Sequence, residues 1–113
     1  MQNTDLLGNP IFLKKVALFE KALQREIERY KDSVFYESLL YALSNGKRLR
    51  PILVLLCSEL LNVPKKEPFS AAIMVELIHT VSLVHDDMID KDVERRGMQS
   101  YHMKYGEEQA LLL

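Results

Sequence analysis

Apolar side chains recur at helical spacing through the first part of the chain. Between residues 10 and 30 they return every three or four positions, which predicts an amphipathic helix of about twenty residues. A second helix is expected to follow a cap formed by Asp32 or Ser33. It should stop at Asn45-Gly46, a pair that favours the left-handed backbone common at helix ends.

Three further segments continue this pattern. Pro51 is expected in the first turn of a third helix, which should end before Pro64. A fourth helix, about residues 68 to 90, contains no internal glycine or proline after its first residue and is apolar on nearly all sides. A polar segment over residues 91 to 105 leads to the start of a last helix at 106 to 113, with acids in its first turn. The pattern predicts an all-α fold.

The fourth predicted helix should be surrounded by other helices, because a helix that is apolar all round is normally buried. The chain supplies only three other full helices and a stub for this purpose. We therefore expect residues 1–113 to be part of one domain. The chain would be either a fragment or one half of a split protein whose partner chain completes the bundle.

Composition narrows the class of protein. The net charge is −1 and 48% of the residues are hydrophobic, which predicts at most one globular domain without general attraction for nucleic acid or anionic membranes. The longest unbroken apolar run, Ile52 to Cys57, is too short to span a bilayer, and no targeting signal is recognised at the start. The single cysteine, Cys57, fits a reducing compartment and a packing role. We expect a cytoplasmic protein with no transmembrane segment.

The segment HDDMIDKDVERRG, which starts at residue 85, combines an acidic cluster with an arginine pair. Asp86, Asp87 and Asp90 are close together on a helix, where residues three and four apart share a face. Their mutual repulsion, increased by the dipole at a helix C-terminus, requires a compensating cation. Magnesium is the expected ion, since it binds through one or two carboxylates and substrate phosphates. Arg95 and Arg96 would contact the phosphate oxygens that the metal leaves free.

The alternative interpretation is that these acids form a solvated surface patch, because exposed charges usually contribute little. The cluster, however, ends a run from Phe69 to Val84 that is apolar on most faces. We therefore expect the charges to line the mouth of a cavity.

A second basic segment, GKRLRP at residues 46–51, precedes the third predicted helix. A glycine turn that presents Lys47 and Arg50 at a helix N-terminus is a reasonable anion-binding site. By itself such a cluster is more often solvated surface. Together with the aspartates and the arginine pair, it predicts two diphosphate sites, one bridged by metal and one held by cations alone.

These motifs together resemble the trans-isoprenyl diphosphate synthases, the family of the farnesyl, geranylgeranyl and longer polyprenyl diphosphate synthases. The matching residues are GKRLRP at 46–51, His79, HDDMID at 85–90 and RRG at 95–97. The resemblance covers roughly residues 15 to 113, about the first third of a family member. It implies an antiparallel helical bundle of the isoprenoid synthase type, of which this chain would be the amino-terminal part.

The resemblance also implies roles for individual residues. Asp86, Asp87 and Asp90 would bind Mg²⁺ that bridges the diphosphate of the allylic substrate, and Arg95 would contact that same diphosphate. Isopentenyl diphosphate would be bound by Lys47, Arg50, His79 and Arg96. Catalysis of the condensation would consist mainly of charge stabilisation of the leaving diphosphate. From the residues alone, a single histidine on an apolar helix such as His79 is more often a core residue.

The family's second aspartate-rich motif is not found in these residues. The chain by itself is therefore expected to be inactive, and a complementary chain carrying that motif is the expected partner. Family members usually dimerise, so a dimer of such units is expected as well.

Product length can be argued from the fourth predicted helix. Ser82, Ile78 and Val75 lie four, eight and eleven residues before Asp86, so they stack along one face at about 5.4 Å per turn, with Val81 beside them. In the family, an aromatic residue at the fourth or fifth position upstream stops the growing hydrocarbon early. Ser82 and Val81 are not aromatic, so a product of at least geranylgeranyl length is our hypothesis. Simple helix packing is the alternative.

Two other functions stay open at this point. The chain would in one case be a non-catalytic fragment or regulatory subunit that pairs with a full-length prenyl synthase through its apolar helix faces. In the other it would be a stand-alone helical interaction domain that covers its apolar surface by self-association. The self-repelling acid cluster beside two arginines favours the enzyme, because a purely structural subunit does not need it.

Overall fold

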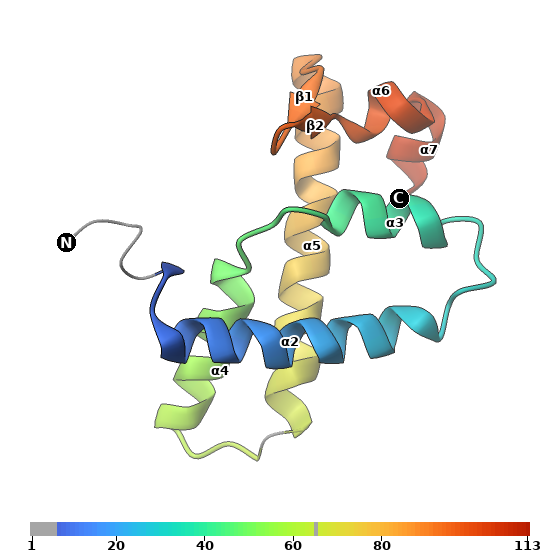
Figure 1. Cartoon of the computed structure of the whole chain (residues 1–113). Helices are drawn as coiled ribbons and strands as arrows, with labels where there is room; N and C mark the ends of the chain where they lie inside the picture. Colours follow the sequence, from blue (N-terminus) through green and yellow to red (C-terminus); the bar gives the residue numbers. More distant parts are fainter. Residues whose placement is uncertain (1–6, 65) are drawn as a thin grey trace. The chain divides into compact units, whose positions relative to one another are not determined.

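A computed structural model of the chain describes residues 7–64 and 66–113, which form six α-helices and one short β-hairpin (Figure 1). The bounds are α2 (Pro10–Glu28), α3 (Tyr36–Leu43), α4 (Leu49–Leu60), α5 (Lys66–Asp90), β1 (Glu94–Arg95), β2 (Met98–Gln99), α6 (Tyr101–Tyr105) and α7 (Glu107–Leu112). The predicted all-α class is confirmed.

The described residues divide into two compact units. The first consists of α2, α4 and the part of α5 up to Glu76. The second consists of α3, the part of α5 from Leu77, the hairpin, α6 and α7. The acidic cluster and the arginine pair both belong to the second unit, whereas Lys47 and Arg50 belong to the first.

The first unit is built around the contact of α2 with α4. Helix α2 begins at Pro10, and the Asn9 side chain caps it by accepting a 2.8 Å hydrogen bond from the backbone N–H of Ile11. This start agrees with the predicted helix. Its apolar stripe is buried, as periodicity predicts, together with three residues of α4. The buried set is Phe12, Phe19, Leu23, Ile27, Pro51, Ile52 and Leu55.

The start of α3 differs from the prediction by a few residues, whereas α4 agrees with it. Helix α3 begins at Tyr36, so neither Asp32 nor Ser33 caps it. The Ser33 hydroxyl instead accepts a 3.1 Å hydrogen bond from the N–H of Phe35, within the turn that precedes the helix. Helix α4 covers Leu49–Leu60, so Pro51 lies in its first turn and the helix ends before Pro64, both as predicted. The left-handed backbone predicted at Asn45 is confirmed by its φ of 61°.

The predicted polar segment over residues 91–105 contains structure that periodicity missed. Strands β1 and β2 pair antiparallel, with Glu94 opposite Gln99 and Arg95 opposite Met98. The two residues between them, Arg96 and Gly97, both have positive φ, as in a type I′ hairpin turn. Strands of two residues are too short to produce an alternating pattern, and Gly97 was the only local signal. Helix α6 follows directly.

The core of the second unit lies where α5, α6 and α7 meet. Val84, Tyr101 and Ala110 are buried there, and the Tyr101 hydroxyl donates a 2.9 Å hydrogen bond to the hydroxyl of buried Ser38. Cys57, on α4, is exposed, so the predicted packing role of its thiol is wrong. The apolar residues around Cys57 occupy more than one side of α4, and Cys57 lies on the side that faces solvent.

Helix α5 is long and apolar enough to cross a membrane when length and composition alone are considered. A core helix of a soluble protein has the same two properties. Two of its carboxylates, Glu76 and Asp87, are buried and paired with arginines within their own units. Such pairing is typical of a helix packed in a protein interior.

Candidate diphosphate site

The three aspartates at the end of α5 lie in different environments. Asp87 is 2% exposed and belongs to the same buried side of the helix as Thr80 and Val84. Asp86 and Asp90 are exposed, and they lie one turn apart on the adjacent, solvent-facing side of the helix. The expectation that the cluster lines a cavity holds for Asp87.

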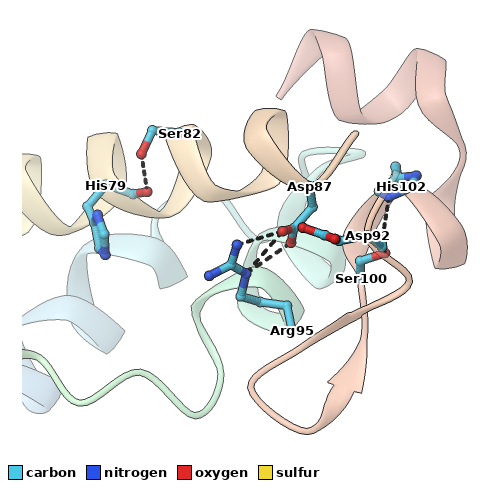
Figure 2. A network of polar contacts seen from close by, with 7 residues as sticks. All are labelled: His79, Ser82, Asp87, Asp92, Arg95, Ser100 and His102. Atoms are coloured by element: carbon cyan, nitrogen blue, oxygen red, sulfur yellow. Dashed lines mark hydrogen bonds and ion pairs between the residues drawn. The ribbon is translucent and has the colours of Figure 1, made fainter. Parts of the chain in front are cut away.

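Asp87 forms a bidentate ion pair with Arg95 of the hairpin (Figure 2). Arg95 donates from Nη2 to Oδ1 at 2.6 Å and from Nε to Oδ2 at 3.0 Å. These hydrogen bonds raise the pKa of the Arg95 guanidinium, and the negative charges of Asp87, Asp92 and Asp86 raise it further. Arg95 therefore stays charged at any physiological pH.

The chain reversal after α5 explains how Arg95 reaches this carboxylate. Lys91 adopts a left-handed φ of 58°, and the N–H of Asp92 donates to the carbonyl of Asp87 at 2.9 Å. The N–H of Lys91 donates to the carbonyl of Met88, which completes a Schellman-type cap. Asp87 is thus engaged by both its carbonyl and its carboxylate in holding the segment that follows the helix.

Arg96 lies beside this pair but has a different partner. Its Nη1 donates to the carbonyl of Ser44 at 3.3 Å. Arg96, Arg95 and Asp87 line a pocket of about 30 Å³, which is large enough for a water molecule. Thr80 also lines the pocket, and its buried hydroxyl has no hydrogen-bond partner among the described residues.

The acidic residues fit a metal ion that also takes ligands from a substrate better than a metal ion held by protein side chains alone. Within residues 7–64 and 66–113, no three histidine, cysteine or acidic side chains gather as they would around a metal. Asp86 and Asp90 nevertheless present two exposed carboxylates on one face. Hard oxygen donors in that number are what Mg²⁺ takes from a protein when substrate phosphates and water supply its other ligands.

The basic segment GKRLRP is organised by a residue that sequence reasoning did not select. Lys47 and Arg50, the predicted ligands, are exposed, whereas Arg48 between them is 7% exposed. Arg48 donates from Nε to Glu20 at 2.5 Å and from Nη1 to Glu76 at 3.1 Å. The role of Arg48 could have been anticipated from Glu76, because an acid within an apolar helix needs a buried cationic partner.

The remaining predicted residues lie on α5. His79 is half-buried, and its carbonyl accepts a 2.6 Å hydrogen bond from the Ser82 hydroxyl (Figure 2). Ser82 and Ile78 are exposed on the same side as Asp86, whereas Val75 and Val81 are half-buried. Their roles in substrate binding and product length stay predictions.

Two further histidines, which sequence reasoning did not select, bond to backbone carbonyls. Nε2 of His85 lies 3.0 Å from the carbonyl of Ala110 on α7. Nε2 of His102 lies 2.7 Å from the carbonyl of Asp92, just after α5. Neither hydrogen bond could be predicted from the sequence, because each joins residues of different segments at a spacing that follows no helical or strand period.

Comparison with known proteins identifies the family. The sequence profile described as "Polyprenyl synthetase" matches residues 32–113. A geranylgeranyl diphosphate synthase of Cyanophora paradoxa is 41% identical over 98 residues, which are 84% of this chain and 33% of that protein. The large subunit 1 of a heterodimeric geranylgeranyl pyrophosphate synthase of Arabidopsis thaliana is 37% identical, over 88% of this chain and 28% of the relative.

Solved structures agree with this match. The geranyltranstransferase of Thermotoga maritima superposes with a TM-score of 0.81 at 39% identity, covering 89% of this chain and 39% of that one. This chain spans about a third of the length of the relatives that it matches. The shared motifs, the helical fold and the profile over residues 32–113 establish that the chain belongs to the polyprenyl synthetase family.

Proposed function

We propose that the chain supplies part of the active site of a magnesium-dependent trans-prenyltransferase. The enzyme would condense isopentenyl diphosphate with an allylic diphosphate to give farnesyl, geranylgeranyl or a longer diphosphate. The observation that carries this proposal is the pair of exposed carboxylates, Asp86 and Asp90, on the helix whose buried Asp87 holds Arg95. Relatives that are geranylgeranyl diphosphate synthases by name support the reaction class.

Asp86 and Asp90 are the residues that would hold Mg²⁺. When bound, the metal acts as a Lewis acid that draws electrons from the leaving diphosphate. Asp87 is a weaker candidate for a ligand than the sequence predicts, because its carboxylate already binds Arg95 in a buried position. A contribution from Asp87 would require that ion pair to open.

Arg95 would contact the allylic diphosphate and stabilise the charge that develops as it leaves. Its side chain is 38% exposed, and the hydrogen bonds to Asp87 engage Nε and Nη2 of the guanidinium. Lys47, Arg50, His79 and Arg96 would hold isopentenyl diphosphate. In the reaction, the carbon–oxygen bond of the allylic diphosphate breaks and its electron pair leaves with the diphosphate. The isopentenyl double bond then attacks the allylic carbon, and a proton is lost.

The exposed side of α5 leads away from Asp86 through Ser82 to Ile78, which is 64% exposed. An exposed apolar residue below a diphosphate site is suited to contact a hydrocarbon tail. Because Ser82 is small, the tail could pass it. This supports a product of geranylgeranyl length or longer.

The rest of the domain would have to come from outside these residues, because they span about a third of the relatives' length. A complementary chain with the second aspartate-rich motif, a dimer of such units and a cytoplasmic location belong to the proposal. That one relative is by name the large subunit of a heterodimer supports a two-chain enzyme. The same observation favours the second candidate, a non-catalytic subunit of a full-length synthase.

The direct test is calorimetric titration of the chain with geranyl diphosphate, with and without Mg²⁺. We expect binding that requires the metal and that weakens at least about tenfold in Asp86→Ala. Glu108→Ala, which removes an exposed carboxylate from α7, is the matched control and should leave binding unchanged. Equal affinity in the presence and absence of Mg²⁺ would contradict the proposal.

A second test separates the enzyme from the non-catalytic subunit. The chain is combined with a polypeptide that carries the missing part of the domain, and condensation is measured with labelled isopentenyl diphosphate. Asp86→Ala should abolish product formation in this assembly. Full activity of Asp86→Ala and Asp87→Ala would favour the non-catalytic subunit.

A further inference from the structure

Two buried side chains converge on a single backbone carbonyl beside the candidate site (Figure 2). The Ser100 hydroxyl donates to the carbonyl of Asp92 at 2.8 Å, and Nε2 of His102 lies 2.7 Å from the same oxygen. A carbonyl can only accept, so Nε2 of His102 carries the hydrogen. Ser100 is fully buried and His102 is 8% exposed, so both side chains are largely shielded from water.

This carbonyl belongs to the residue that anchors the segment between α5 and the hairpin. The N–H of Asp92 is bonded to the carbonyl of Asp87 on α5, while its own carbonyl is held by Ser100 and His102. The N–H of Ser100 in addition donates to the carbonyl of Val93 at 2.9 Å. The residues that flank the hairpin are therefore tied to each other and to the helix end.

Arg95 lies within the segment that these bonds enclose. Its side chain is 38% exposed, and an ion pair with one long, partly exposed side chain is normally weak because ordering that side chain costs entropy. Fixing the backbone on both sides lowers this cost, because the guanidinium is then already directed at Asp87. Preorganised donors are also the ones that stabilise developing charge best.

We propose that His102 and Ser100 are positioning residues that hold the hairpin so that Arg95 is kept on Asp87 and presented to a diphosphate. The presentation of Arg95 to a diphosphate rests on the proposed function, whereas the placement of Arg95 on Asp87 can be tested without any ligand. Because Ser100 and His102 bond to the same carbonyl, each one still holds the segment when the other is lost. Loss of both should have more effect than the sum of the two single losses.

The test is NMR of the whole chain, following the Arg95 Nε–H signal in Ser100→Ala, His102→Leu and the double variant. We expect hydrogen exchange of this N–H to accelerate about twofold in each single variant and about tenfold or more in the double variant, where the buried carbonyl loses both partners. His102→Asn, which keeps an amide donor, should retain more protection than His102→Leu. Tyr101→Phe is the matched control, because it removes one buried hydrogen bond of α6 that does not involve Asp92.

The outcomes separate positioning from mere stability and from the proposed function. If the double variant and Tyr101→Phe both lower the melting temperature while the Arg95 signal is unchanged, the proposal is overturned. Should the double variant fail to fold, the contrast between His102→Leu and His102→Asn decides the question, and equal exchange in the two overturns the proposal. Binding of inorganic pyrophosphate with Mg²⁺ is measured in parallel. If the wild-type chain does not bind it but Arg95 responds as expected, the proposed function fails and the positioning role stands.

Discussion

Removal of the Arg48 guanidinium is expected to cost more folding free energy than removal of the Glu76 charge. Arg48 bonds to both Glu20 and Glu76, whereas Glu76 is 2% exposed and bonded to Arg48. Arg48→Met therefore leaves a buried carboxylate without its cation, which costs about 3 to 5 kcal/mol. Glu76→Gln keeps an amide oxygen as acceptor and leaves Arg48 paired with Glu20, so about 1 to 2 kcal/mol is expected.

The backbone at Arg48 adds a second, separable contribution. Its φ of 60° lies in the left-handed region, where a residue with a side chain is strained. Arg48→Gly loses the same ion pairs as Arg48→Met but relieves this strain. It should therefore be less destabilised than Arg48→Met, by about 1 kcal/mol.

The assay is urea unfolding of the chain, followed by helical circular dichroism. A chain of this size is stabilised by roughly 5 to 15 kcal/mol, so the loss in Arg48→Met should appear as a large drop in the urea midpoint. Glu59→Gln is the matched control for Glu76→Gln, because Glu59 pairs with Lys15 but its side chain is 61% exposed. It should cost less than about 1 kcal/mol.

Two results would refute this reasoning. One is a loss in Arg48→Met no larger than in Glu76→Gln, which would mean that the Glu76 carboxylate is stabilised by something other than Arg48. The other concerns the double variant Arg48→Met with Glu76→Leu. It should recover most of the stability lost in Arg48→Met, because the uncompensated charge is gone. No recovery would show that the loss came from packing.

Two further predictions concern the rest of the chain. In an active complete enzyme, Ser82→Phe should shorten the product more than Val81→Phe, because Ser82 is exposed on the side of Asp86 and Val81 is half-buried. The chain length of the product is measured in both variants. An unchanged product distribution in both would count against the assignment of this side of α5 to the hydrocarbon tail. Cys57→Ser should change the free energy of unfolding by less than about 0.5 kcal/mol, because the thiol is exposed; a clear drop in the urea midpoint would show that it packs after all.

Much of the fold could be predicted from periodicity alone. The apolar stripe of α2 and the length of α5 follow from spacing within one segment, and the structure confirms both helices. The hairpin could not be predicted in this way. Its strands have two residues each, and their pairing depends on the left-handed backbone at Arg96 and Gly97. Such a turn requires two specific dihedral angles and leaves little trace in hydrophobic spacing.

The sequence by itself determined the helical segments other than α6 and showed which charged residues are close along the chain, because helical spacing and residue type are local properties. It also placed four aspartates, among them Asp86, Asp87 and Asp90, and two arginines within a dozen positions. Only the tertiary structure decided that Asp87 is buried on Arg95 while Asp86 and Asp90 stay exposed, and that Arg48 turns inward to Glu76. The physical reason is that burial and pairing of a charge depend on chain reversals and packing between segments far apart in sequence, which local periodicity does not encode.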